Sequence, residues 1–219
     1  MISRATENFL KSIYDLRNDG GWAKTSQLAR RLEQRPASVT NMVQKLAASE
    51  LKLVKYIPYH GVRLTRKGEL AALEIIRHHR LIELFLARAL DVPWDRVHEE
   101  AEQLEHVLSE YLEDKLEAAL GEATTDPHGS PIPTRDGRIP NRHSLPLTQI
   151  EAGVEVRVVE VYDHDPQLLR YLGDIGLYPG AEFKVLDREA FGNSLQILRK
   201  GKPYSLGEEA IPHISVEVV

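Results

Sequence analysis

The sequence predicts a mainly α protein with α+β parts: an N-terminal winged helix-turn-helix, a helical domain, and a small C-terminal β-barrel. Three patterns support this prediction. They are two short helical segments joined by a tight turn, long helical periodicity in the middle of the chain, and alternation of apolar and polar residues near its end. With 219 residues, 42% of them hydrophobic, the chain can bury cores in two or three small domains.

The first 68 residues have the pattern of a winged helix. Apolar spacing over residues 5–18, ended by NDGG, predicts one helix. The stretches KTSQLARRLEQ and RPASVTNMVQKLAASEL predict two more, with Pro36 near a helix start, and the short turn between them indicates a helix-turn-helix. We expect Val39, Val43 and Leu46 in the core. The next stretch, LKLVKYIPYHGVRLTRKG, has two extended runs around a turn, as in a β-hairpin wing.

The rest of the chain divides into a helical part and a strand-rich part. Helical periodicity runs from Glu69 to about Arg88 and from Trp94 to about Leu120. Residues 126–146 contain five prolines and little periodicity, which indicates a crossing segment or linker. Beyond it, VEVRVVEV, AEFKVL, SLQILR and SVEVV predict the short strands of a barrel. We therefore expect domains at residues 1–68, 69–146 and 147–219.

The net charge of −5 conceals an uneven distribution. Residues 1–68 hold 13 Lys and Arg against 5 Asp and Glu, whereas residues 69–125 hold 5 against 14. A basic module suits a polyanion, and an acidic helical module suits a cation or a protein partner. The charge partition therefore predicts two separate tasks.

Composition excludes several classes of protein. The chain has no cysteine, so disulfides, zinc ribbons and thiol catalysis are excluded and any metal must use histidine, carboxylate or carbonyl ligands. No apolar run approaches the roughly 18 residues of a membrane-spanning helix, and the polar start lacks the apolar centre of a signal peptide. We expect a cytoplasmic protein without a membrane partner.

The stretch HEEAEQLEHV, residues 98–107, resembles two zinc-peptidase motifs and completes neither, because both fail at Glu102. On a helix, His98, Glu102 and His106 would form one stripe, with Glu105 beside His106. Carboxylates crowded on one face repel each other unless a cation lies among them. Glu102, Glu105 and His106 would give one divalent ion two negative charges and one imidazole.

That ligand set favours Mn(II) or Fe(II), with cobalt, nickel or zinc as laboratory substitutes. Without a thiolate, manganese is favoured over iron. The preceding helix carries another pair at helical spacing, His79 and Glu83, and antiparallel packing could bring the two helices' ligands face to face. The plain alternative for any single His/Glu pair is an exposed polar face.

Seven segments together resemble the diphtheria toxin repressor family of metal-dependent transcriptional repressors, and within it the manganese-responsive branch. They are TENFLKSIYDL, SQLARRLEQRPASVTNMVQKL, VRLTRKG, HHRLIELFL, VHEEAEQLEHV, DPHGSPIP and LGDIGLYPGAEF, so the resemblance covers the whole chain. It implies a winged helix, a helical dimerisation and metal-binding domain, and a Src-homology-3-like barrel. It also implies a metal-activated homodimer that binds a palindromic DNA operator and controls metal-ion homeostasis.

The resemblance places the regulatory metal on Glu102, Glu105 and His106, with a further ligand at Asn8. Glu102 stands where iron-responsive relatives have a cysteine, which agrees with manganese. Manganese-responsive relatives have carboxylates at the positions of Asn8 and Lys11, so either the Asn8 carbonyl or Glu7 completes the site. A two-metal cluster is not expected here.

A second metal site per subunit is implied in two competing versions that share Glu83. One uses His79, Glu83 and His98, closed by Asp165 and Gln167 from the barrel. The other brings Asp126 and His128 of the crossing segment toward Glu83 and the same barrel acid; otherwise these two residues lie in an ordinary proline-flanked turn.

The second helix of the helix-turn-helix is expected to read DNA from its N-terminal end. Ser26 is equally a candidate helix cap, and Lys55, Arg63 and Lys67 are expected to contact phosphates, which makes binding salt-dependent. The full set of expected DNA contacts is Thr25, Ser26, Gln27, Arg35, Pro36, Ala37, Ser38, Thr40, Asn41, Lys45, Lys55, Arg63 and Lys67.

The resulting hypothesis is a manganese-dependent repressor that is not an enzyme and has no small-molecule substrate. Two alternatives remain at this stage. One is a carboxylate/histidine metalloenzyme in a helical bundle, although no second Glu-x-x-His pair supports it. The other is a metal-independent winged-helix regulator.

Overall fold

The computed structural model describes residues 2–18, 20–141, 143–162, 165–188 and 194–219. Contacts divide the chain into two compact units, and the long helix α4 contributes to both. The first unit comprises residues 1–79, 105–108 and 133–139; the second comprises residues 80–104, 109–132 and 140–219.

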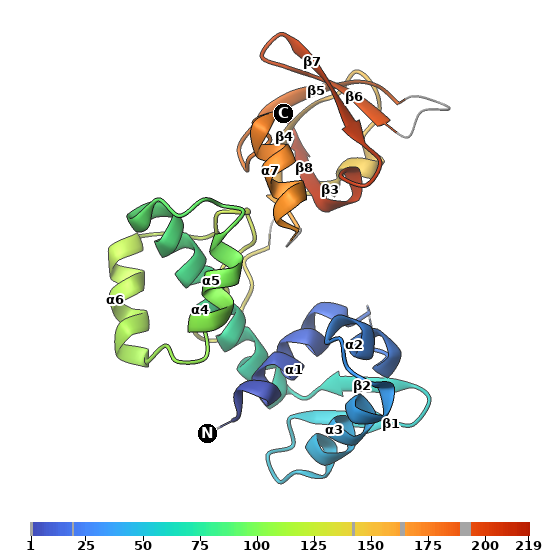
Figure 1. Cartoon of the computed structure of the whole chain (residues 1–219), viewed down its shortest axis with the longest axis vertical. Helices are drawn as coiled ribbons and strands as arrows, with labels where there is room; N and C mark the ends of the chain where they lie inside the picture. The colour runs from blue at the N-terminus through green and yellow to red at the C-terminus, as the bar shows by residue number, and fades with distance from the viewer. Residues whose placement is uncertain (1, 19, 142, 163–164, 189–193) are drawn as a thin grey trace. The chain divides into compact units, whose positions relative to one another are not determined.

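The first unit contains the predicted winged helix-turn-helix (Figure 1). Its elements are α1 (Arg4–Leu16), α2 (Thr25–Arg31), α3 (Pro36–Ala48), β1 (Val54–Ile57), β2 (Gly61–Leu64) and the first part of α4 (Arg66–Leu90). Ser3 caps α1, and Pro36 is the first residue of α3. Strands β1 and β2 pair as an antiparallel hairpin, so the predicted helices and wing are confirmed.

A core beneath these elements joins α1 to α3. Phe9, Leu10 and Ile13 of α1 share one buried cluster with Leu28 of α2, and the predicted core residues Val39, Val43 and Leu46 of α3 belong to it. The wing is tied to the same core by a bridge between Ala23 and Val62. Helices α1 and α3 are therefore coupled through packed side chains.

In the second unit, α5 (Val97–Leu104) and α6 (Glu110–Leu120) follow the remainder of α4. The prediction of one long helix from Trp94 to about Leu120 is wrong, because the chain turns between Leu104 and Glu110. Ser109 starts the new helix by accepting a hydrogen bond from the amide of Leu112. As a result Glu105 and His106 lie in a turn after α5, and not on one continuous helical stripe.

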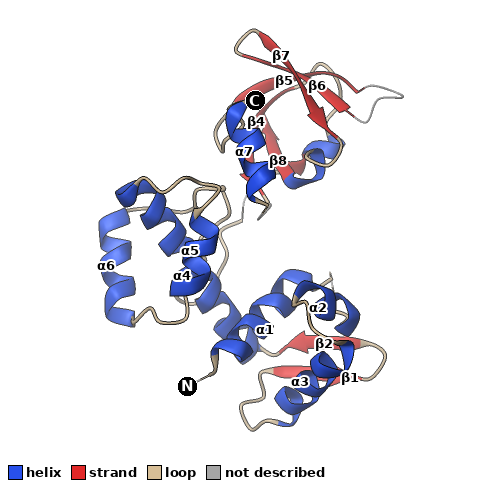
Figure 2. Ribbon diagram, in the orientation of Figure 1, coloured by secondary structure: helices blue, strands red, loops and turns tan. Residues whose placement is uncertain are grey.

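The C-terminal strands form a six-stranded antiparallel sheet in the order β3-β8-β4-β5-β6-β7. It curves around a buried apolar core, as predicted for a barrel (Figure 2). Helix α7 and strands β3 and β7 were not predicted. Asp165 caps α7, and Leu169 and Leu172 belong to the core. The elements are β3 (Leu145–Pro146), β4 (Glu155–Val161), α7 (Pro166–Asp174), β5 (Glu182–Arg188), β6 (Ser194–Arg199), β7 (Lys202–Gly207) and β8 (Ile214–Val218).

Candidate metal centres and DNA interface

The carboxylate of Glu105 is the centre of a buried polar cluster in the first unit. Its side chain is completely buried, and Lys11 Nζ lies 2.9 and 3.1 Å from its two oxygens. On one side Glu105 Oε2 accepts a hydrogen bond from Nδ1 of His79 at 2.5 Å. On the other side Glu105 Oε1 lies 3.3 Å from Nε2 of His106. Glu105 and His106, which are neighbours in the sequence, are therefore also close at their side chains. Lys11 of α1 and His79 of α4 contact the same carboxylate.

The ring of His106 is held by Glu7, whose Oε2 lies 2.7 Å from Nδ1. A carboxylate at that distance fixes the proton on Nδ1 and leaves the lone pair on Nε2, as outer carboxylates do for metal-binding histidines. His106 Nε2 is buried and makes no hydrogen bond. Glu7 is therefore engaged in orienting His106, which favours Asn8 over Glu7 as the further ligand.

Asn8 supplies the second unsatisfied atom. Its Oδ1 is buried and has no hydrogen-bond partner in the structure. A buried carbonyl oxygen without a donor costs stability, so such atoms call for an explanation. An amide oxygen, an imidazole nitrogen and an anionic carboxylate form a donor set suited to a hard divalent ion. The residues present therefore fit a metal.

Glu102 adds a further acidic group close by. Ligand atoms of His79, Glu102 and Glu105 lie within 4.8 Å of one another. The Glu102 side chain remains 36% exposed, and its Oε1 is 3.8 Å from Nε2 of His98. A partly exposed carboxylate can rotate toward an incoming cation, whereas the buried Glu105 is already fixed.

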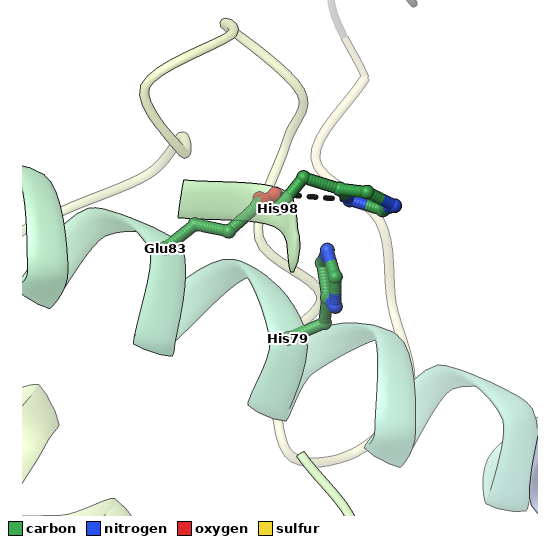
Figure 3. Close-up of side chains that lie close together, drawn as sticks. All are labelled: His79, Glu83 and His98. Carbon is green, nitrogen blue, oxygen red and sulfur yellow. Dashed lines mark hydrogen bonds and ion pairs between the residues drawn. The ribbon is translucent and has the colours of Figure 1, made fainter. Parts of the chain in front are cut away.

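A second group of ligand atoms is formed along α4 and α5. His79 and Glu83 stand one turn apart on α4, and His98 from α5 brings Nδ1 to 3.4 Å from Glu83 Oε1 (Figure 3). Ligand atoms of the three residues lie within 4.8 Å of one another, and Glu83 is nearly completely buried. The ligand atoms of α4 and α5 therefore face each other, as the sequence predicted.

Glu83 also belongs to a third group, with Asp126 and His128 of the crossing segment. His128 Nε2 donates to the carbonyl of Trp94 at 2.8 Å, so Nδ1 keeps its lone pair, 3.9 Å from Glu83 Oε1. Asp126 Oδ1 accepts from the amides of His128 and Ser130.

The backbone holds this group against the barrel. The carbonyl of His128 accepts from the amide of Val161, and Gly129 has φ 91°. A Cβ on Gly129 would lie 2.1 Å from the carbonyl oxygen of Val159, so only glycine permits this approach. The crossing segment is therefore held against β4 by a backbone hydrogen bond and by the close approach of Gly129, which an ordinary turn would not require.

The structure does not bring the expected barrel ligands to Glu83. Asp165 Oδ1 accepts from the amide of Gln167 at the start of α7, and both side chains are exposed. Neither belongs to a ligand group among the residues that the structure describes. Both versions of the second site therefore lack the barrel acid, whereas the group His79, Glu83 and His98 and the group Glu83, Asp126 and His128 are both present.

Burial and the neighbouring Glu83 raise the pKa of Asp126 from 3.8 to about 7. Because the folded pKa lies above the unfolded one, this carboxyl makes the metal-free protein less stable as pH rises from about 4 to 7. Asp126→Asn keeps the two accepted amide bonds and removes the like charge. Above pH 7 we expect the chelated variant to have a larger free energy of unfolding than the wild type, by on the order of 2 kcal/mol, and therefore a higher melting temperature; the gap should close toward pH 4. Thermal melts across this range test it; a gap independent of pH would contradict it.

Most of the expected DNA contacts lie on the exposed surface of the winged helix. Exposed residues at α3 include its N-cap Arg35 and, within the helix, Pro36, Ala37, Ser38, Asn41 and Lys45. Lys55 of β1 and Lys67 of α4 are exposed as well. Thr25, Thr40 and Arg63 are half-buried. Arg63 lies over the ring of Trp22, 5.0 Å from its centroid. The capping role considered for Ser26 is wrong, because α2 begins at Thr25 and Lys24 is its N-cap residue.

Comparison with known proteins decides the family. Residues 1–62 match the model of the iron-dependent repressor N-terminal DNA-binding domain, and residues 65–134 match that of its metal-binding and dimerisation domain. The iron-dependent repressor IdeR of Mycobacterium leprae is 33% identical over 98% of this chain and 97% of its own length. The chain belongs to the iron-dependent repressor family. Residues 145–218 of this family member match the FeoA domain.

Solved structures agree. A manganese-dependent transcriptional repressor in complex with manganese has 35% identity and a TM-score of 0.88, over 98% of this chain and all of that one. ScaR with bound Zn²⁺ has 29% identity and a TM-score of 0.81, over 98% and 99%. The diphtheria toxin repressor of Corynebacterium diphtheriae is 28% identical over 97% of this chain and 96% of its own length.

This repressor is thus a DNA-binding, metal-dependent transcriptional regulator with a dimerisation domain, and not an enzyme. The predicted fold class and function are confirmed, and the helical-bundle metalloenzyme and the metal-independent regulator are set aside. Among the described residues, no helix combines the length and the apolar character needed to cross a membrane.

Proposed function

We propose that this repressor is activated by Mn(II) held by Asn8, Glu102, Glu105 and His106, with Fe(II) as the alternative ion. The observation that carries the proposal is the pair of buried, unpartnered ligand atoms: Asn8 Oδ1 on α1, and His106 Nε2, which lies 3.3 Å from the buried carboxylate of Glu105. A carboxylate at position 102 and the absence of thiolates favour the harder ion. When bound, the ion supplies a charge that holds these ligands together.

Binding of the ion by these residues would change the affinity of the protein for DNA through the contacts between α1 and the rest of the winged helix. Asn8 lies on α1, whereas Glu105 and His106 lie in the turn that follows α5. Sharing ligands between them fixes α1, and the common core carries that restraint to α3. A coupling of about 1–3 kcal/mol per site is enough to act as a switch.

The active species is proposed to be a homodimer that binds a palindromic operator in the cytoplasm and controls metal-ion homeostasis. Large apolar side chains on α6, Tyr111 and Leu112, are exposed and suit a dimer contact. The thirteen expected DNA contacts around α2, α3 and the wing are retained as proposed contacts. The second metal position is proposed at Glu83, Asp126 and His128, with His98 beside them, while Asp165 and Gln167 are not retained.

The test is an operator-binding titration on the full chain. A duplex would be selected from a random library in the presence of Mn(II), and its affinity then measured by fluorescence anisotropy with Mn(II) and with chelator. We expect binding only with the metal. Equal affinity after exhaustive chelation would contradict the proposed function.

Asn8→Leu is expected to raise the stability of the metal-free protein and to lower its affinity for Mn(II). Leucine has a similar size and lacks the unpartnered oxygen, so the metal-free protein should gain about 1–2 kcal/mol of unfolding free energy. Mn(II) affinity should fall by about 10-fold or more, because a ligand is lost. Chemical denaturation with chelator and metal titration measure the two effects; unchanged Mn(II) affinity would remove Asn8 from the site.

A further inference from the structure

The carboxylate of Glu105 has a position for a cation beside each of its two oxygens, and the two positions have different surroundings. On the side of Oε1 lies His106 Nε2, 3.3 Å away and without a hydrogen bond. The unpartnered Oδ1 of Asn8 is on α1, between Glu7 and Lys11 in the sequence. On the side of Oε2 lies His79, whose Nδ1 is 2.5 Å from the carboxylate. A carboxylate with ligand atoms on both sides has the arrangement needed to bridge two cations.

Lys11 fills the second position. Its ammonium contacts both oxygens of Glu105, at 2.9 and 3.1 Å, and lies 3.4 Å from Nδ1 of His79. The Lys11 side chain is only 14% exposed, so its charge is largely enclosed with that of Glu105. Asn8 and Lys11 are three residues apart on α1, which places a neutral oxygen and a cation on one face of that helix.

We propose that Lys11 acts as a tethered cation that occupies the place of a second metal ion between His79 and Glu105, so that the cluster around Glu105 takes one divalent ion. A divalent ion at the same place would lie against the ammonium in a poorly solvated site, where like charges repel strongly. The inference rests on the proposed function, since it counts the ions at the same site.

This arrangement also explains how the metal-free cluster stays folded. A fully buried carboxylate needs a partner of opposite charge or it protonates. Lys11 supplies that charge without taking up Asn8 Oδ1 or His106 Nε2, both of which remain without hydrogen bonds. The lysine therefore neutralises Glu105 and leaves the ligands for the first ion unengaged.

The test compares the wild type, Lys11→Glu and Lys11→Arg as full-length chains. Mn(II) retained per chain is measured by equilibrium dialysis and metal analysis, and circular dichroism with metal present checks folding. We expect Lys11→Glu to bind one more ion than the wild type, and Lys11→Arg to bind the same number as the wild type. Equal counts in a folded Lys11→Glu protein would overturn the proposal. A wild type that retains no Mn(II) would contradict the proposed function itself, and with it the proposal of one ion in the cluster around Glu105.

A second measurement guards against a Lys11→Glu protein that fails to fold. In the Glu83→Ala variant the second site is disabled while Lys11 is intact. Its Mn(II) electron paramagnetic resonance spectrum should keep the resolved hyperfine lines of an isolated ion up to saturation. An exchange-coupled spectrum would show two adjacent ions despite Lys11 and would overturn the proposal.

Discussion

Glu102→Ala is expected to raise the Mn(II) concentration needed for half-maximal operator binding by about 100-fold, since it removes a charged ligand. Glu102 is 36% exposed at the side chain, so its loss leaves no cavity in a core and should not unfold the protein. The measurement is an anisotropy titration of operator DNA with Mn(II). Affinity for DNA at saturating metal should recover partly, because the DNA-binding surface is untouched.

The matched control is Glu100→Ala, an exposed acidic residue on the same helix α5. It removes the same charge from the same acidic helix without touching a ligand group. We expect its titration to overlay the wild type. If both variants shift the metal dependence equally, the effect is long-range electrostatics and Glu102 is not a ligand.

Glu105→Gln should have two large effects. It leaves the enclosed ammonium of Lys11 without its counter-charge, which costs about 3 kcal/mol of stability, at the low end for a broken buried ion pair because Lys11 keeps some access to water. It also removes an anionic ligand, so Mn(II) should no longer promote DNA binding at micromolar concentration. Denaturation of the chelated protein and operator titration measure these effects separately.

The double variant Lys11→Met, Glu105→Gln separates stability from metal binding. Removing both charges should restore most of the lost stability, because neither partner is left buried alone. It should not restore the response to Mn(II). Recovery of the metal response in the double variant would show that Glu105 acts only as a structural partner of Lys11.

Spacing along the chain is enough to predict much of the regulatory site. Glu102, Glu105 and His106 are close in sequence, and any compact local conformation places them near one another. The turn after Leu104 was missed because neither glycine nor proline interrupts the periodicity there. Ser109, which caps α6, is the local signal that marks the break.

Other features depend on contacts between residues far apart in the chain. The Lys11–Glu105 ion pair joins positions 94 residues apart, and the unpartnered Oδ1 of Asn8 depends on how α1 packs. The choice of Asp126 and His128 over Asp165 and Gln167 depends on irregular backbone in a proline-rich segment, which periodicity does not describe. Asp165 followed by Pro166 is a typical start of a helix, with Asp at the N-cap and Pro at the first helical position. This pattern predicts α7, and it does not by itself indicate a metal ligand.

Anomalous diffraction from crystals grown with Mn(II) would show which side chains hold the ion, because it locates manganese among them. We expect a peak within bonding distance of Asn8 Oδ1, His106 Nε2 and the carboxylates of Glu102 and Glu105, with the Lys11 ammonium still against Glu105. Density for manganese elsewhere in the chain, with Asn8 Oδ1 and His106 Nε2 still unliganded, would contradict it.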